Sequence, residues 1–278
     1  KFISTPLQLS FDKIKNMTKE VIYEIAENIK KDSLLSEEEF SKMYHDSITN
    51  PDNFWHKQAS NYLEWISEWD QVSEHDFRKG QVSWFKGGKI NATINCMDRH
   101  LEKRADQTAI IWEGDDPKDS TYISYQELYE SVCRFANALK ERGVSKGDRV
   151  CIYMPMIPEA AYAMLACARI GAIHSVVFGG FSPDAIAGRV QGANSNIVIT
   201  ADEGLRGGKT IGLKANVDAG LANVDCVDTV IVVKRTGADI NWVEGRDVWY
   251  SDITTPASTS HEPEVMGAED PLFILYTS

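Results

Sequence analysis

From about residue 91 onward, short apolar runs alternate with segments of helical periodicity. The apolar runs are rich in β-branched residues and do not alternate with polar ones, as expected of strands buried on both faces. They predict strands at 150–154, 175–178, 197–200, 229–233 and 272–276. The segments between them predict helices at about 124–143, 158–171, 183–191 and 211–221. Because crossovers between parallel strands are right-handed, this rhythm predicts an α/β fold with a doubly wound, mostly parallel sheet flanked by helices.

Capping residues mark the ends of these predicted helices. Ser124 followed by Glu127 is a capping box, and Gly143 supplies a left-handed stop. Pro158 suits the first turn of the second helix, and Ser182 suits the N-cap of the third. The local signals therefore agree with the period of the apolar positions.

Two regions of the chain differ in pattern. Residues 1–89 combine charged helical stretches with a tryptophan-rich segment, and we interpret them as a helical and irregular N-terminal extension packed onto a larger body. Residues 90–278 are then expected to be the first α/β portion of a longer domain. Within this portion, 235–270 predicts a long surface excursion anchored by Trp242 and Trp249.

The composition favours a folded protein that does not bind polyanions. Hydrophobic residues make up 43% of the 278 residues and charged residues 25%, which excludes a disordered chain. Acidic residues outnumber basic ones by 41 to 29, so the net charge is −12 and nucleic acid is not an expected partner. No apolar stretch has the length of a membrane helix, so no membrane partner is expected. The five cysteines form no C-x-x-C pair, and we interpret them as reduced core thiols of a cytoplasmic protein.

Two predicted loops lie beyond the carboxyl ends of the strands, where an open parallel sheet binds its ligands. The first contains Phe178, Gly179 and Gly180. Its paired glycines let the backbone approach a ligand closely, and the helix that follows presents free N–H groups to an anion. A tight turn that needs glycine explains this loop equally well.

The second loop carries Arg206 and Lys209, which are separated only by Gly207 and Gly208 and are followed by a helix. With no bulk between them, both cations can turn toward one oxyanion, and the planar guanidinium suits a phosphate. Arg189 could join them, although an arginine late in a helix more often stabilises its C-terminus. The alternative for the pair is a solvated surface loop.

Other chemistries lack their motifs in this sequence. Neither loop completes a dinucleotide or Walker fingerprint, no nucleophile elbow is present, and the six histidines have no metal-ligand spacing. His174 begins a buried strand, and we interpret it as a satisfied core residue. The last predicted strand leads into Thr277 and Ser278, a suitable start for a glycine-rich phosphate loop, with an ordinary strand end as the alternative.

A set of separate segments, in order from about residue 38 onward, matches one known family. They are Phe54-Trp55, Trp84-Phe85, Asn91-Ala92, Asp98-Arg99-His100, 147–150, Met154-Pro155, Pro158-Glu159, 168–172, 177–182 and 270–278. Together they closely resemble the acetyl-CoA synthetases, the AMP-forming, acetate-activating members of the acyl-adenylate-forming superfamily.

The resemblance implies a ligase that converts acetate, ATP and CoA into acetyl-CoA, AMP and pyrophosphate through an acetyl-adenylate. In that family the segment matching Arg206 to Lys209 binds the phosphate end of the CoA nucleotide, and the segment matching 178–180 lies beside the CoA adenine. Thr277 and Ser278 match the start of the ATP phosphate loop. The Mg²⁺ site and the catalytic lysine match sequence beyond Ser278, so the chain alone is expected to be inactive. The family often has a second arginine where this chain has Lys209, which ranks Arg206 above Lys209.

Two alternatives stay open at this point, and a third lacks its motif. A propionate ligase of the same family would share these segments, because the acyl pocket lies outside them. A nicotinamide-dependent oxidoreductase would need the complete glycine fingerprint, which is missing. A noncatalytic nucleotide-binding module would leave the Arg206 loop as a surface feature. The expected partners are the small molecules acetate, ATP and CoA, and the remainder of the protein's own chain.

Overall fold

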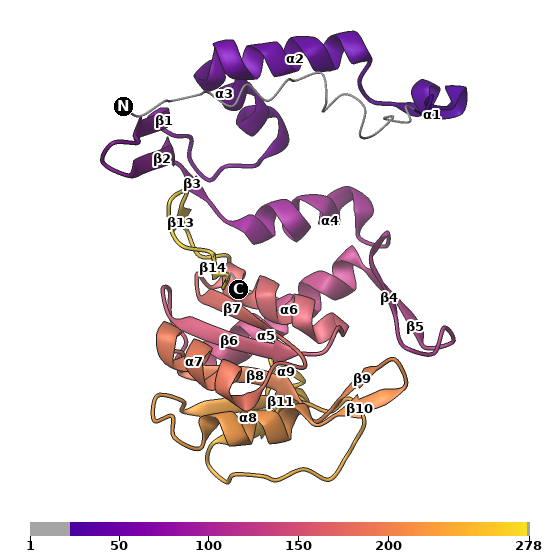
Figure 1. Cartoon of the computed structure of the whole chain (residues 1–278), viewed down its shortest axis with the longest axis vertical. Coiled ribbons are helices and arrows are strands. Elements are labelled where there is room, and N and C mark those ends of the chain that lie inside the picture. The colour runs from indigo at the N-terminus through magenta and orange to yellow at the C-terminus, as the bar shows by residue number, and fades with distance from the viewer. Residues whose placement is uncertain (1–22, 277–278) are drawn as a thin grey trace, which may run out of the picture. The chain divides into compact units, whose positions relative to one another are not determined.

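The computed structural model describes residues 23–276, and the chain divides into two compact units, Lys1–Phe54 and Trp55–Ser278. The described part of the first unit contains the helices α1 (Glu27–Asp32) and α2 (Glu37–Thr49), and α3 (Pro51–Tyr62) begins in it and continues into the second unit (Figure 1). A capping box starts α2, because the Ser36 hydroxyl accepts from Glu39 N–H while the Glu39 carboxylate accepts from Ser36 N–H.

A six-stranded parallel sheet forms the centre of the second unit. Its strand order is β12 (Asp247–Trp249), β11 (Thr229–Val233), β8 (Ile197–Ala201), β6 (Arg149–Met154), β7 (Ile173–Phe178) and β14 (Phe273–Ile274). All five neighbouring pairs run parallel. The predicted doubly wound, parallel α/β fold is therefore confirmed, and each predicted strand is present within a few residues.

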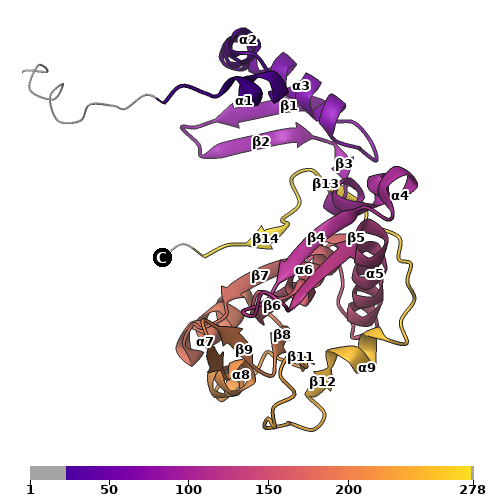
Figure 2. The ribbon, with the colours of Figure 1, turned by 90° about the vertical axis from the view of Figure 1, so that its right-hand side faces the viewer.

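The helices cover both faces of this sheet. They are α5 (Tyr125–Glu141), α6 (Pro158–Arg169), α7 (Pro183–Ala193), α8 (Leu213–Leu221) and the short α9 (Tyr250–Thr254). The step from β6 to β7 runs toward one edge, and the step from β7 to β8 runs back across β6, so right-handed crossovers put α6 and α7 on opposite faces. In Figure 2, α5 and α6 lie on one side of the sheet and α7 and α8 on the other.

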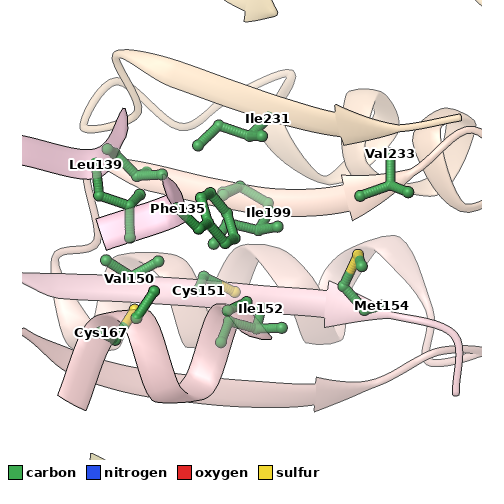
Figure 3. Packing of buried hydrophobic residues seen from close by; sticks show 14 of the residues in the cluster. Phe135, Leu139, Val150, Cys151, Ile152, Met154, Cys167, Ile199, Ile231 and Val233 are labelled. Atoms are coloured by element: carbon green, nitrogen blue, oxygen red, sulfur yellow. The ribbon is translucent and has the colours of Figure 1, made fainter. Parts of the chain in front are cut away.

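The core consists of nonpolar side chains from the central strands and the helices beside them. Figure 3 shows Phe135 and Leu139 of α5 packed among residues of β6 and β8 that include Val150 and Ile199. All four side chains are fully or almost fully excluded from solvent. Burial on both sides explains why these strands read as continuous apolar runs.

The predicted capping residues hold their positions. Ser124 and Glu127 form the capping box of α5, Gly143 has φ +85° just after that helix, and Pro158 is the first residue of α6. The Ser182 hydroxyl accepts from Ala185 N–H at the start of α7. These local signals were sufficient to place both ends of α5 and the starts of α6 and α7.

The interpretation of 1–89 as helical and irregular missed a β-hairpin formed by β1 (Gln71–Asp76) and β2 (Gln81–Lys86). Both faces of this two-stranded hairpin carry exposed polar residues, so no apolar alternation marks it in the sequence. Next to it, the rings of Trp65, Trp69 and Phe85 lie 4.7–5.3 Å apart. The tryptophans thus pack largely against one another and the hairpin.

Short elements connect this hairpin to the sheet. They are β3 (Lys89–Ile90), which pairs with β13 (Met266–Gly267), the π-helix η2 (Ile94–Asp98), α4 (Arg99–Arg104), and the antiparallel pair β4 (Thr108–Glu113) and β5 (Ser120–Ser124). The β4–β5 hairpin is also absent from the predicted elements.

The predicted surface excursion at 235–270 is only partly an excursion. It contributes β12 to the edge of the main sheet and also contains α9 and β13. Trp242 and Trp249 are anchors as expected, since their rings stack 4.8 Å apart and pack against the core. Strand β12 has only three residues, of which two are apolar, so it does not stand out in a polar segment and was not predicted.

The cysteines divide by environment. All five are free, and Cys133, Cys151 and Cys167 are buried as expected of core thiols. Burial raises the pKa of the Cys151 and Cys167 thiols to about 12. Cys96, by contrast, is exposed, so the interpretation of the cysteines as core thiols is wrong at this position.

Candidate functional site

The carboxyl ends of β6, β7 and β8 meet at the point where the strand order reverses, because β6 has β7 on one side and β8 on the other. In open α/β sheets this switch point opens the crevice that binds ligands. A cavity of about 430 Å³ lies there, a size suited to a small-molecule site. It is lined by Trp112, Glu113, Gly114, Asp115, Met154, Pro155, Met156, Ile157, Val176, Val177, Phe178, Gly179, Gly204, Leu205, Arg206, Ile211, Leu213 and Arg235.

The Phe178-Gly179-Gly180 loop forms one wall of this cavity. A Cβ at Gly179 would come within 2.7 Å of the Met154 carbonyl oxygen, so only glycine fits there. Gly180 has φ +139°, and its N–H donates to the Tyr153 hydroxyl at 3.2 Å. The tight turn is therefore real, and it leaves Phe178 as a ring 48% exposed at the cavity.

The N–H groups around this loop are largely used within the protein. Phe181 N–H donates to the Phe178 carbonyl at 3.0 Å, and Ala185 N–H at the start of α7 donates to Ser182. The helix start consequently offers fewer free donors to an anion than the sequence indicated, and the side chain of Phe178 is the more prominent feature of the loop.

The segment after β8 is a β-hairpin, which corrects the expectation of a loop from residue 201 to 209 directly before a helix. Strand β9 (Gly204–Arg206) pairs antiparallel with β10 (Lys209–Ile211), and α8 begins only at Leu213. Gly207 and Gly208 have φ +56° and +73°. Two glycines with positive φ are what a two-residue hairpin turn requires, so the Gly-Gly pair was an available signal for this hairpin.

Arg206 and Lys209 are directly opposite one another across this hairpin. Opposed residues of an antiparallel pair extend to the same face, so both cations lie on one side of the hairpin, as the sequence predicted. Arg206 lines the cavity, and its guanidinium carbon lies 5.0 Å from the centre of the Phe178 ring. Lys209 is exposed beside it and is not one of the cavity-lining residues. Among residues 23–276, neither cation forms an ion pair.

Arg189 does not join this pair. Its guanidinium lies 4.9 Å from the Phe181 ring and 5.1 Å from the Tyr276 ring, and one nitrogen donates to the Ala185 carbonyl at 3.0 Å. It lies within α7 and not at its C-terminus. The position of Arg189 between two aromatic rings thus differs from both predictions, namely that it joins Arg206 and Lys209 or that it stabilises a helix C-terminus. Arg189 is also not among the residues that line the cavity.

Sequence reasoning missed the wall that comes from the β4–β5 hairpin and from Arg235. The Arg235 guanidinium lies 4.9 Å from the Trp112 ring and pairs with Asp119 at 2.8 Å, while Trp112 Nε1–H donates to the Met156 carbonyl at 2.7 Å. No nucleotide-binding motif marks these residues. The only available signal was the Gly-Asp-Asp-Pro turn after residue 113, which is typical of a hairpin.

Asp202 fixes the loop that carries Arg235. Its buried carboxylate accepts the backbone N–H groups of Arg235 at 2.8 Å and Gly237 at 2.7 Å. Burial alone would raise the pKa of Asp202, but these hydrogen bonds outweigh it and hold the pKa below its usual value. Asp202 is therefore an ionised support for the cavity wall.

The remaining predicted site residues lie elsewhere. Thr277 and Ser278, the expected start of a phosphate loop, lie outside the described residues. Within the described range, no group of three or more His, Cys, Asp or Glu side chains is arranged to hold a metal ion. Between residues 23 and 276, no helix combines the length and apolar character needed to cross a bilayer.

Two family models match adjacent parts of the chain. The model described as AMP-binding enzyme matches residues 97–278, and the model described as acetyl-coenzyme A synthetase N-terminus matches residues 40–96. Together they extend from the tryptophan-rich segment to the last residue.

Curated relatives resemble the chain over most of its length. It is 56% identical over 257 residues to acetyl-coenzyme A synthetase 2 of Pseudomonas aeruginosa, and 58% identical over 257 residues to acetyl-coenzyme A synthetase of Alcanivorax borkumensis. Each match covers 92% of this chain and 40% of the relative. The chain thus spans about 40% of the length of the curated relatives that it matches.

A solved structure shares the fold. Acetoacetyl-CoA synthetase from Streptomyces lividans superimposes with a TM-score of 0.78 over 86% of this chain and 36% of that chain, at 23% sequence identity. At this identity the likeness concerns the fold alone.

Proposed function

Because the chain belongs to the AMP-binding enzyme family, we propose that it is the N-terminal part of an acetate–CoA ligase. The complete protein then converts acetate, ATP and CoA into acetyl-CoA, AMP and pyrophosphate through an acetyl-adenylate. The identity of 54–58% to relatives named acetyl-coenzyme A synthetase supports this activity. In this assignment, 1–89 form an N-terminal extension and 90–278 the first α/β portion of the adenylating domain.

We assign the nucleotide end of CoA to the cavity beside Phe178 and Arg206. The observation that carries this assignment is the guanidinium of Arg206, which is stacked 5.0 Å from the Phe178 ring, free of an ion pair in the described residues and open to the cavity. A half-exposed aromatic ring offers a stacking surface to a base, and a guanidinium offers a planar pair of donors to a phosphate. The cavity of about 430 Å³ has room for such a group.

The residues of this site bind and orient their ligand and do not exchange protons or electrons with it. Gly179 and Gly180 keep the loop close to the sheet so that Phe178 stands at the cavity. Arg206 and Lys209 supply local positive charge at the site, whereas the chain as a whole has a net charge of −12. With their aid the thiol end of CoA can be held in a defined direction relative to the acyl-adenylate.

The ATP phosphates are assigned to the segment that starts at Thr277 and Ser278, and Mg²⁺ to residues outside this chain. The strand β14 supports this assignment, because it runs parallel to β7 and so delivers its carboxyl end to the same edge of the sheet as the CoA loops. ATP supplies the adenylyl group of the first half-reaction and releases pyrophosphate, and Mg²⁺ would neutralise phosphate charge there. The free cysteines are consistent with a cytoplasmic location.

Titration of the full-length protein with CoA and with dephospho-CoA tests the site. We expect CoA to bind more tightly than dephospho-CoA, and Arg206→Ala to weaken CoA binding about tenfold or more while leaving dephospho-CoA binding nearly unchanged. Arg104→Ala is the matched control, since Arg104 is an exposed arginine at the end of α4 whose side chain forms no hydrogen bond or ion pair in the described part of the protein. Equal affinities of the unsubstituted protein for the two ligands would refute the phosphate assignment.

A further inference from the structure

The turn of the β9–β10 hairpin carries a backbone donor that is already engaged. Gly208 N–H donates to the Asp115 carboxylate at 3.0 Å, and Asp115 belongs to the loop between β4 and β5. The two residues are 93 positions apart in sequence, so this contact joins two separate hairpins. Asp115 also lines the cavity together with Arg206.

The loop that presents Asp115 is held in place by other contacts. Gly114 N–H donates to the Asp119 carbonyl at 2.7 Å, and the Asp119 carboxylate pairs with Arg235 at 2.8 Å. Arg235 is itself stacked on Trp112. These contacts fix the β4–β5 loop, and the loop in turn holds the Asp115 carboxylate at the turn of the β9–β10 hairpin.

The choice of partner for Asp115 is informative. Arg206 lines the same cavity, yet within residues 23–276 the carboxylate takes the Gly208 N–H and no ion pair forms with Arg206. The guanidinium thus stays available to a ligand, whereas the backbone donor of the turn is occupied by an anion that belongs to the protein. An ionised acceptor forms a hydrogen bond about twice as strong as a neutral one, so the occupant is not displaced freely.

We infer that Asp115 is an affinity-setting residue of this site: its carboxylate occupies the hairpin donor that a ligand phosphate would take, and must move aside when a terminal phosphate binds. This inference rests on the proposed function. A ligand with a phosphomonoester then gains contacts with Arg206 and Lys209 but loses part of that gain in displacing Asp115 and approaching its negative charge. A ligand without the phosphate leaves the Asp115–Gly208 contact intact and is not affected.

The experiment compares Asp115→Asn and Asp115→Ala in the full-length protein by calorimetric titration with CoA and dephospho-CoA. Both variants are expected to bind CoA about three- to tenfold more tightly than the unsubstituted protein, with dephospho-CoA unchanged within about twofold. Glu113→Gln is the matched control, because Glu113 lines the same cavity but, among the residues the structure describes, its carboxylate forms no hydrogen bond or ion pair with the β9–β10 hairpin. It removes the same charge, and it is expected to tighten CoA binding by less than Asp115→Asn.

Two results would overturn the inference. If both Asp115 variants bind CoA as the unsubstituted protein does or more weakly, the contact serves to hold the hairpin and not to compete with phosphate. If Glu113→Gln tightens CoA as much as Asp115→Asn, the effect is one of general charge and not of the Gly208 donor. Arg206→Ala distinguishes this failure from failure of the proposed site itself. If Arg206→Ala weakens CoA binding, the phosphate site stands and only the role of Asp115 is refuted. If Arg206→Ala leaves CoA binding unchanged, both the site and the role of Asp115 are refuted.

Discussion

His174 lies in β7 with its side chain and backbone together 9% exposed, and its Nδ1 has no hydrogen-bond partner among residues 23–276. Its ring is 5.7 Å from that of Phe273 in the neighbouring strand β14. Burial lowers the pKa of His174 to about 4, because the charged imidazolium would lose its hydration there. The sequence correctly indicated a core histidine, but the expectation that its polar atoms are satisfied is wrong.

This histidine makes the stability of the protein depend on pH. Its pKa in the folded state is about 4, below the ordinary value of 6.5, so between these values the unfolded state binds the proton and the folded state does not. Stability is therefore lost as the pH falls from about 6.5 toward 4. From pH 7.5 to pH 5, His174 is expected to remove about 2 kcal/mol from the free energy of unfolding.

Urea unfolding of His174→Leu at these two pH values measures the effect. The loss of stability between pH 7.5 and 5 should shrink by about 2 kcal/mol in the variant. His75→Leu is the control for the loss of a histidine at a position outside the core, since His75 is exposed on β1. An identical pH dependence in His174→Leu and the unsubstituted protein would show that His174 is protonated without cost in the fold.

At the scale of elements, one buried arginine joins the π-helix η2 to the end of α6. Arg169 is 1% exposed and donates to both carboxylate oxygens of Asp98 at 2.9 Å, to Thr93 at 3.1 Å and to the His261 carbonyl at 2.7 Å. Burial opposes the charge, but Asp98 outweighs it and raises the pKa of Arg169 above its ordinary value. Asn91 reinforces the junction, because its amide donates to the Arg169 and Glu264 carbonyls.

Replacing Arg169 by alanine is expected to destabilise the protein by about 3–5 kcal/mol. The substitution leaves the largely buried Asp98 carboxylate without its partner, and it leaves Thr93 and the His261 carbonyl without the donor that Arg169 supplies. Lys79→Ala is the control: Lys79 pairs with Asp76 at 3.0 Å on an exposed hairpin, and its loss should cost about 1 kcal/mol or less. Urea or thermal unfolding distinguishes the two, and similar small losses in both variants would mean that the Arg169 junction contributes no more than a surface pair.

The elements differ in how far the sequence determined them. Helices such as α5 carry their own signals, because the capping box at Ser124 and the left-handed glycine at 143 act through neighbouring residues. The three hairpins β1–β2, β4–β5 and β9–β10 were missed, since each depends on pairing across short, partly exposed strands. In the sequence, the turn glycines of β9–β10 indicated only that the two cations beside them could approach one ligand.

The candidate site shows the same limit. Arg206, Lys209 and the glycine loop at 178–180 follow buried strands, so the rule for parallel sheets was enough to predict that they share one edge. The partner of Arg189 could not be predicted, because the Phe181 and Tyr276 rings that enclose it are 95 positions apart in sequence. Asp115 and Trp112 reach the cavity from a hairpin that no local pattern relates to the main sheet.

At the scale of the whole molecule, the proposed site would bind an anion against the net charge of the protein. The chain carries −12, while the positive groups at the cavity are few and local. At ordinary ionic strength, salt screens interactions between charges more than about 8–10 Å apart. The attraction between the ligand and nearby cations and its repulsion by distant negative charges therefore depend differently on the salt concentration. For CoA, whose phosphates would lie against Arg206 and Lys209, the near contacts dominate the electrostatic free energy of binding.

Removal of the two hairpin cations is therefore expected to abolish or reverse the salt dependence of CoA binding. In the unsubstituted protein, raising the salt from about 0.05 M to 0.5 M should weaken CoA binding several-fold, because it screens the attraction to the hairpin cations. In the double variant Arg206→Ala, Lys209→Ala the cavity keeps Arg235, whose charge is paired with Asp119, so the repulsion from the net negative protein dominates. Salt screens that repulsion, so the weakened affinity of the double variant should stay constant or rise with salt.

Calorimetric titration across this salt range, with Arg104→Ala as the control, measures both slopes. Arg104→Ala removes one positive charge from the surface without changing a cavity-lining residue, and it should keep the slope of the unsubstituted protein. A double variant whose CoA affinity still falls steeply with salt would place the binding cations elsewhere on the molecule. In that case the attraction would have to come from residues outside the β9–β10 hairpin, since the remaining field of a protein this acidic repels the ligand.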